Sequence, residues 1–384
     1  MAKYIHQLPD WPHFRWQEGA LIRHLARVRH RQGRLAGRME ALGFDLQSEA
    51  LLATLTRDVL KSSEIEGEHL DREQVRSSIA RRLGMDAGGL GSVDRHTDGV
   101  VEMMLDATQG YEKPLNEQRL FAWHGALFPT GRSGLSKVIV GAWRDDRTGP
   151  MQVVSGPIGR SRVHFEAPAA ERLPDEMAAF LVWFEGENAA DPVIKAGLAH
   201  LWFVTIHPFE DGNGRIGRAV ADMALARSEG SPQRFYSLSA QFQQNRQGYY
   251  NQLESAQKGG LDVTAWLEFF LNCLEEAIDG AEQLLAGVLF KARFWEAHRD
   301  CTLNERQRKV LNQLLDGFEG KLTSSKWAKL TKISADTALR DINDLISKGI
   351  LEREPEGGRS TSYVLAPISP GTPGSRSSAP NDPD

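Results

Sequence analysis

The sequence predicts an all-α protein with a small β-hairpin, followed by a C-terminal unit of three helices and a second hairpin. Apolar residues recur at helical spacing through most of residues 16–290. Short β-like pieces separated by turn residues occur around residues 137–155. After residue 302, three helical stretches precede two short strands that flank a Gly-rich turn. We therefore expect a helical core and a separate smaller unit.

The composition is that of a globular protein. A length of 384 residues indicates two or three domains, and 41% hydrophobic with 25% charged residues is enough for a core. We expect no membrane span and no signal peptide, and hence a cytoplasmic protein. The net charge of −5 argues against nucleic-acid binding over the whole surface. Cys273 and Cys301 form no C-x-x-C pair, so neither a disulfide framework nor a zinc site is expected.

The N-terminal part reads as three helices. Residues 16–43 form a long helix with six arginines and no acid between Gly19 and Met39. Such a basic face can bind nucleic acid or an acidic partner, but it is more often simply solvated. A second helix covers 51–61. Asp71 and Gln74 form a capping box for a third helix at 75–83.

The middle of the chain alternates core helices with loops. The glycines of 84–91 lack the Lys-Ser/Thr of a phosphate-binding P-loop. Residues 93–110 and 115–128 are expected as core helices, and His124 as a packed histidine. The pieces 137–143 and 151–155 are expected as strands joined by the turn 145–150. Residues 174–186 form an amphipathic helix.

Residues 207–218, HPFEDGNGRIGR, contain the densest group of chemically useful side chains. The apolar helix 193–206 should end at His207, since a following proline disfavours α geometry. The helical pattern of 215–227 places Gly212, Asn213 and Gly214 in the turn that opens the next helix. Backbone N–H groups at a helix N-terminus point at anions.

The side chains of this segment suit a nucleotide phosphate. Arg215 and Arg218 lie on the first turn of the helix, where guanidinium groups bind phosphate oxygens. Asp211 is an oxygen ligand of the kind that Mg²⁺ prefers. His207 is mostly neutral at pH 7 when unperturbed and can accept a proton. The segment therefore predicts chemistry on a nucleotide phosphate.

The segment resembles the signature of Fic-domain proteins, H-x-F-x-[D/E]-G-N-G-R-x-x-R, at every specified position. The resemblance covers roughly residues 50–290. It implies a Fic fold and a protein adenylyltransferase that moves AMP from ATP to a Ser, Thr or Tyr hydroxyl and releases pyrophosphate. His207 then takes the proton, Asp211 holds Mg²⁺, and Gly212, Asn213 and Gly214 cradle phosphate oxygens. Arg215 steadies the α- and β-phosphates and Arg218 the γ-phosphate.

The resemblance also implies an inhibitory motif, [S/T]-x-x-x-E-[G/N], which Ser62, Glu66 and Gly67 fit. Glu66 would pair with Arg218 and keep ATP in a non-productive pose. The hairpin around 137–155 corresponds to the flap that lines the target cleft in the family. Asn245, and less firmly Tyr249 or Tyr250, are expected on the adenine and ribose side, although core packing is about equally consistent with the tyrosines.

Residues 302–366 resemble a winged helix. The stretches 304–316, 324–331 and 335–349 are expected as helices, with 334–348 in the recognition-helix position, and 350–353 and 362–365 as strands. Eleven Lys and Arg against nine Asp and Glu is a weak basic excess, so protein contact or dimerisation is at least as well supported as DNA binding. Residues 369–384, rich in Ser, Pro and Gly, are expected to be disordered.

Four regions and several alternatives follow. The regions are 1–92 with the inhibitory motif, 93–290 as the catalytic core, 302–366, and the tail. The partner is a hydroxyl-bearing target protein, possibly the chain itself, with a homodimer plausible and no membrane. Other family members transfer phosphate, UMP or phosphocholine, and de-modification by the same cleft is open. A DNA-binding regulator that senses nucleotide is the alternative from another class.

Overall fold

The computed structural model describes residues 3–85, 91–147, 149–156, 160, 162–187, 190–318, 320–354 and 361–367. It is almost entirely helical with short two-stranded hairpins, which confirms the all-α prediction. The chain divides into two compact units, residues 1–284 and 285–384. Most of the Gly-rich loop at 84–91, the turn at 356–359 and the tail at 369–384 lie outside the described residues. The four regions predicted from the sequence stay a prediction.

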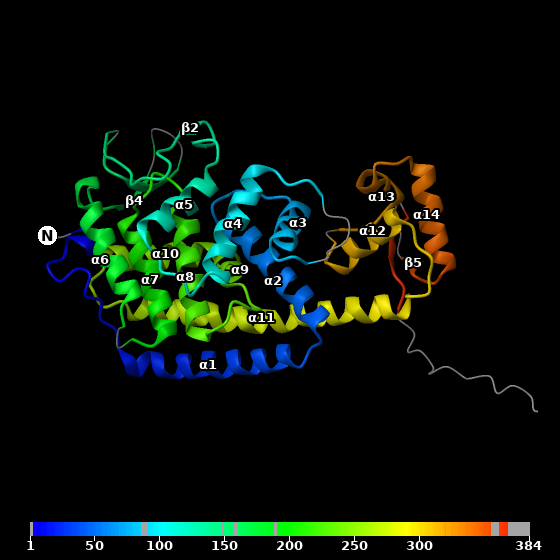
Figure 1. Ribbon diagram of the computed structural model, residues 1–384, viewed down its shortest axis with the longest axis horizontal. Coiled ribbons are helices and arrows are strands. Elements are labelled where there is room, and N and C mark those ends of the chain that lie inside the picture. Colours follow the sequence, from blue (N-terminus) through cyan, green and yellow to red (C-terminus); the bar gives the residue numbers. More distant parts are fainter. Residues whose placement is uncertain are drawn as a thin grey trace, which may run out of the picture. The chain divides into compact units, whose positions relative to one another are not determined.

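Two consecutive helices, α7 (Pro192–Ile206) and α8 (Asn213–Glu229), form the centre of the first unit (Figure 1). Every residue of α7 except Pro192 and Lys195 is buried, as its apolar sequence predicts. The two helices pack closely because Gly217 has no side chain. A Cβ there would lie 2.7 Å from Cγ1 of Val204. The turn between these helices carries the signature segment.

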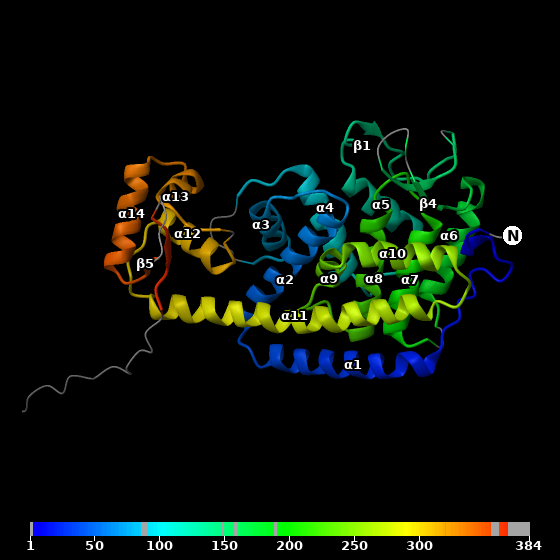
Figure 2. The same cartoon turned by 180° about the vertical axis from the view of Figure 1, so that it is seen from behind.

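The basic helix α1 (Glu18–Glu40) runs beside α11 (Thr264–Ala297), as Figures 1 and 2 both show. Five of its six arginines pair with carboxylates of the first unit. Arg27 pairs with Glu275, and Arg34 and Arg38 share Glu282. Arg31 pairs with Asp279 and Arg29 with Asp191. The acidic partner of this helix is therefore largely its own chain.

Three helices follow α1: α2 (Phe44–Ile65), α3 (Arg72–Arg82) and α4 (Arg95–Gln109). The sequence predicted only half the length of α2. Asp71 caps α3, as predicted, by accepting from the backbone of Gln74. The expected reciprocal bond is replaced, since the Gln74 side chain accepts from the backbone N–H of Asp94, the cap of α4, at 2.8 Å. This bond ties α3 to α4 instead of closing a capping box.

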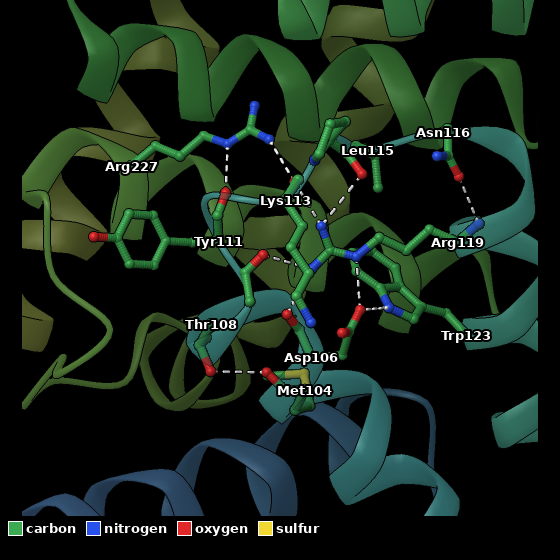
Figure 3. A network of polar contacts seen from close by, with 12 residues as sticks. Met104, Asp106, Thr108, Tyr111, Lys113, Leu115, Asn116, Arg119, Trp123 and Arg227 are labelled. Carbon is green, nitrogen blue, oxygen red and sulfur yellow. Dashed lines mark hydrogen bonds and ion pairs between the residues drawn. The ribbon is translucent and has the colours of Figure 1, made fainter.

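A polar network fixes the connection between α4 and α5 (Glu117–Leu127), as Figure 3 shows. Asp106 on α4 accepts from Arg119 Nε at 2.6 Å and from Trp123 Nε1 at 2.7 Å. Arg227, at the end of α8, donates to the backbone oxygens of Tyr111 and Lys113. These bonds attach the α4–α5 loop to the central helix.

Two hairpins follow α5. In the first, β1 (Arg132–Ser133) pairs with β2 (Ser136–Lys137), and in the second, β3 (Gln152–Ser155) pairs with β4 (Arg162–Glu166). The predicted pairing of 137–143 with 151–155 is wrong. The backbone after β2 is used elsewhere, because Ile139 donates to the Glu210 carboxylate and Arg144 to the carbonyl of Pro208. This segment therefore braces the signature turn.

The remaining elements of the first unit are the 3₁₀ turns η1 (Ile5–Gln7) and η2 (Ala170–Arg172), and the helices α6 (Leu173–Glu185), α9 (Leu238–Gln244) and α10 (Arg246–Lys258). α10 contacts β4, so it lies beside the second hairpin. His124 on α5 is fully buried and its ring stacks on Phe209 of the signature at 4.2 Å. It is packed, as the sequence predicted.

The second unit contains α12 (Glu305–Leu315), α13 (Ser324–Thr331), α14 (Ala335–Ser347) and the hairpin of β5 (Leu351–Arg353) with β6 (Tyr363–Leu365). Its core is built around Trp327, Phe294 and Ile342, all fully buried. The order of helices and strands agrees with the expected one, and the winged-helix assignment stays a prediction. In the described part of the chain, no helix has the length and apolarity needed to cross a membrane.

Candidate functional site

The signature turn opens into a cleft of about 530 Å³ in the first unit. This volume lies in the range of small-molecule sites. The cleft brings together the end of α2, the second hairpin, the signature turn and α10. Its lining includes Glu66, His207, Asp211, Gly212, Asn213, Gly214, Ser155, His164, Val153, Val204, Arg246, Tyr249, Tyr250, Leu253 and Glu254.

The backbone of the signature turn is shaped by its sequence. His207 has a φ of 51° and ends α7 in a left-handed conformation, and the following proline disfavours continuation of the α-helix at this residue. Gly212 has a φ of 80°, and a Cβ there would lie 3.0 Å from the ring of Phe128. The side chain of Asn213 is buried and bonds both the N–H and the carbonyl of Phe209. Asn213 thus holds the turn together, while the N-terminus of α8 faces the cleft.

Arg144 stabilises the backbone of the signature turn. The sequence did not predict this role. Its fully buried guanidinium donates to the carbonyl of His207 at 2.8 Å and to the carbonyl of Pro168 at 2.5 Å, and pairs with Asp146. The residue lies in a segment that was expected to be a strand-turn junction. No local pattern in the sequence distinguishes it from an exposed arginine.

His207 is held as a neutral imidazole. Its Nδ1 lies 3.2 Å from the carbonyl oxygen of Val204, which can only accept. Nδ1 therefore carries the proton and Nε2 keeps its lone pair. Burial lowers the pKa of His207 to about 4. The imidazole is accordingly uncharged over the physiological range.

Asp211 lines the cleft at the start of the same turn. One carboxylate oxygen accepts from the Ser133 hydroxyl and the other from the backbone N–H of Gly212 at 2.5 Å. Ser133 belongs to the first hairpin, so that hairpin helps to orient the carboxylate. Among the described residues, no group of three or more His, Cys, Asp or Glu side chains could hold a metal ion.

Arg218 is buried against the end of α2. It donates from Nε to the Ser62 hydroxyl at 2.9 Å and from Nη2 to the Ser62 carbonyl at 2.8 Å. Nη1 forms an ion pair with Glu66 at 2.8 Å. Burial opposes the charge of Arg218, but the Glu66 carboxylate outweighs it and raises the pKa of the guanidinium. The structure therefore brings the predicted motif together with the second signature arginine.

The Glu66 carboxylate also occupies the space in front of Gly214. A Cβ on Gly214 would collide with its oxygen. Gly67 follows with a φ of 84°, a left-handed conformation that glycine adopts without strain, so the chain can leave α2 directly after Glu66.

Arg215 has a carboxylate partner that the sequence did not reveal. Its Nη1 pairs with Glu68 at 2.6 Å, and only 2% of its side chain is exposed. Glu68 also contacts His96 Nε2 at 3.4 Å. The hydrogen bond to Glu68 raises the pKa of His96, while burial works against it. Glu68 was visible as one of three acids near Gly67, but which arginine it meets depends on the packing of α2 against α8.

Of the three residues expected on the adenine and ribose side, Asn245 is exposed, Tyr249 is buried and Tyr250 lines the cleft. Asn245 is exposed, and its side chain caps α10 by accepting from the backbone of Gly248. Tyr249 is buried and its hydroxyl bonds His200 at 2.8 Å, so it mainly packs the core, although it reaches the cleft. Tyr250 lines the cleft and donates to the Ile65 carbonyl. Nucleotide binding by these residues stays a prediction.

Comparisons with known proteins find two family models that match parts of this chain. Residues 114–225 match the Fic/DOC family, and residues 4–85 match a domain of unknown function, DUF4172. The protein adenylyltransferase Fic of Drosophila mojavensis is 28% identical over 220 residues, 56% of this chain and 39% of that protein. The protein of the same name from Nematostella vectensis is 35% identical over 114 residues, 29% of this chain and 25% of that protein.

The chain spans less than half the length of these curated relatives. Among solved structures, a Fic family protein from Desulfovibrio desulfuricans G20 is similar with a TM-score of 0.50 and 23% identity. The similarity covers 90% of this chain and 96% of that chain. This structural similarity shows that the two chains share a fold.

Proposed function

Because the chain carries a Fic/DOC-family domain at residues 114–225, we propose that it is a protein adenylyltransferase. It moves AMP from ATP to a Ser, Thr or Tyr hydroxyl of a protein and releases pyrophosphate. The observation that carries the proposal is the convergence in one cleft of a neutral histidine, a carboxylate and a helix N-terminus, with two buried arginines on the first turn of the same helix.

His207 accepts the proton of the incoming hydroxyl at Nε2, which its bond to Val204 keeps free. The hydroxyl oxygen forms a bond to the α-phosphorus, and the bond from that phosphorus to the bridging oxygen of pyrophosphate breaks. A positioned base of this kind accelerates proton transfer by about 10²–10⁴-fold. The rest of the acceleration comes from positioning and from stabilising charge on the phosphates.

The N-terminus of α8 and the two arginines bind the triphosphate. The backbone N–H groups of Asn213 and Gly214 face the phosphates, while that of Gly212 donates to Asp211. Arg215 takes the α/β side and Arg218 the γ-phosphate. Asp211 suits Mg²⁺, since this ion takes one or two carboxylates together with substrate phosphates, and it would supply charge neutralisation there. The apolar lining from Val153, Val204 and Leu253 offers a surface for the purine ring.

The same contacts support autoinhibition. Arg218 cannot bind a γ-phosphate while Ser62 and Glu66 hold it, and the Glu66 carboxylate stands against Gly214, where an anion has to approach. Removing one partner of a buried ion pair typically costs about 3–5 kcal/mol, less where one partner is partly exposed, as Glu66 is. Release of α2 is therefore costly, and a partner or an assembly change can drive it.

The test compares wild type, Glu66→Gly and Glu66→Gly/His207→Ala, each incubated with Mg²⁺ and ATP labelled at the α-phosphate. Label is read on the protein and on its proteolytic peptides. We expect little label on wild type, strong label on Glu66→Gly, and a marked decrease in the double variant.

The outcomes separate the parts of the proposal. Equal label on wild type and Glu66→Gly would remove the inhibitory role. Equal label on Glu66→Gly and the double variant would mean that another group is the base. Absence of label from all three would require another nucleotide donor, and failure with UTP, CTP and GTP as well would reject the transferase.

A further inference from the structure

A second cavity, of about 560 Å³, lies in the first unit between α1 and the C-terminal end of α8. The start of α2 and the segment after α8 complete its wall. Among the described residues, this cavity and the cleft at the signature turn share no lining residue. Its volume lies in the range of small-molecule sites. It is therefore a candidate for a separate ligand.

The principal charged group of this cavity is the carboxylate of Glu229, the last residue of α8. Its Oε1 accepts hydrogen bonds from Gln32 Nε2, at 2.6 Å, and from the Tyr236 hydroxyl. Both bonds go to one oxygen, so Oε2 remains available to a ligand. Burial raises the pKa of Glu229, although the positive charge of Arg234 works against this rise. A further positive charge beside Oε2 would therefore stabilise the carboxylate.

The donors in the cavity wall are already used inside the protein. The Gln47 amide nitrogen donates to two backbone carbonyls, which leaves its oxygen as an acceptor. Arg29 donates to Ser228 Oγ at 2.8 Å and pairs with Asp191 at 3.0 Å. Within the part of the chain that the structure describes, the buried amide oxygen of Gln32 has no hydrogen-bond partner. The wall thus offers oxygen acceptors, and the C-terminus of α8 adds its partial negative charge.

Apolar side chains form another part of the wall. Leu35 and Met39 come from α1 and Phe235 from the segment after α8, and all three are buried. A chain of methylene groups would be removed from water against them. No group of three or more His, Cys, Asp or Glu side chains suited to a metal ion occurs among the residues described. This wall therefore suits an organic cation better than a metal ion.

We propose that this cavity binds a small organic cation, a primary ammonium group on an aliphatic chain. The ammonium group donates a hydrogen bond to Glu229 Oε2, and the aliphatic chain lies against Leu35, Met39 and Phe235. The inference concerns a separate site and does not depend on the proposed transferase function.

The probe for this site is n-butylammonium chloride, with 1-butanol and sodium butyrate as its uncharged and anionic analogues. Ligand-observed NMR titration of the full chain at constant ionic strength measures the affinity for each. We expect saturable binding of butylammonium, about tenfold weaker binding of butanol, and no binding of butyrate. Saturating ATP should leave the butylammonium affinity unchanged, because the two sites are separate.

Two glycines of α1 provide a matched pair of variants. Gly33 lines the cavity, whereas Gly37, one turn further along, lies outside its lining. A Cβ at either position would meet nothing within 4 Å, so both positions accept a side chain. Gly33→Met should fill the cavity and abolish saturable butylammonium binding, while Gly37→Met should leave it unchanged.

A third variant tests the charge. Glu229→Gln keeps the shape of the side chain and removes its charge, so the butylammonium affinity should fall about tenfold, the loss expected for a hydrogen bond between charged groups. Melting temperatures close to that of wild type would show that the three variants fold.

Each contrary result overturns the inference. Equal butylammonium binding by wild type and Gly33→Met would place the probe elsewhere on the chain. Equal affinity for butylammonium and butanol, or an unchanged affinity in Glu229→Gln, would show that the site does not select a cation. Absence of saturable binding to wild type would reject the site itself. The labelling experiment with ATP tests the proposed function independently of all these results.

Discussion

At the scale of single residues, His207 combines two constraints that shape its chemistry. The left-handed backbone places the imidazole at the turn, and the Val204 carbonyl fixes which nitrogen bears the proton. Burial then lowers the pKa of His207 to about 4. In the proposed transfer the base form of His207 is the active one, so activity is lost only as the pH falls through that value.

This gives a pH prediction for transfer. The labelling rate of Glu66→Gly should be nearly constant from pH 8 to about pH 5.5 and should fall towards pH 4. Rates measured with ATP at saturation across this range test it. A half-maximal rate near pH 6.5 would mean that the imidazole is fully hydrated when it acts.

Arg218 gives a second prediction at this scale. In the Glu66→Gly background, Arg218→Ala should weaken ATP binding by about tenfold or more, because a hydrogen bond between charged groups contributes about 1.5–3 kcal/mol. ADP binding should change little, since it lacks the γ-phosphate. Calorimetric titration with both nucleotides measures the difference, and equal losses would place Arg218 on another phosphate.

At the scale of elements, the segment that directly follows α2 supplies a carboxylate to each signature arginine. Glu66 pairs with Arg218 and Glu68 with Arg215, and both acids lie within three residues of each other. Ser62 on the last turn adds two hydrogen bonds. A displacement of this one segment therefore frees both arginines at once.

Glu68→Gln tests how far the second pair contributes. Glu68 is about one third exposed, and such a pair contributes on the order of 1 kcal/mol, so the variant alone should raise labelling by about fivefold at most. Glu66→Gly should raise it more, and the double variant most. Labelling by Glu68→Gln that equals or exceeds that of Glu66→Gly would make the Arg215 pair the main restraint.

The sequence predicted the elements of the first unit better than their contacts. The helices around the signature followed from apolar spacing and from Pro208, and the motif residues Ser62 and Glu66 do lie on Arg218. Glu68, Arg144 and His164 could not be found in this way. Glu68 meets Arg215, Arg144 meets His207 and His164 meets Glu254 across 147, 63 and 90 residues, and only packing closes these gaps. The sequence did not predict that β3 pairs with β4, because an alternating apolar pattern does not specify which strand lies beside another.

At the scale of the whole molecule, the core of the first unit contains titratable groups that must stay uncharged. Burial lowers the pKa of His124 and of His200 to about 4, as it does for His207. Unfolded histidines titrate near pH 6.5. The unfolded chain thus binds more protons than the folded one below that pH, and the folded state loses stability there.

The corresponding prediction is a melting temperature that falls as the pH drops from about 6.5 towards 4. His200→Phe, which has no titratable ring, should make the fall shallower, with Ser136→Ala as the unchanged control. Thermal denaturation in buffers of equal ionic strength measures both slopes. A slope that is the same in His200→Phe and in wild type would show that this histidine does not contribute.

The two signature arginines have only 2% of their side chains exposed, and two carboxylates directly after α2 balance their charges. In the proposed function, the triphosphate and these two carboxylates are thus interchangeable counter-ions for one pair of cations. A chain in which this segment has moved away holds two uncompensated charges until a triphosphate binds. Its thermal stability should therefore depend on the nucleotide concentration. In a cell, the activated form would then survive in proportion to the ATP supply, and energy depletion would remove it by unfolding.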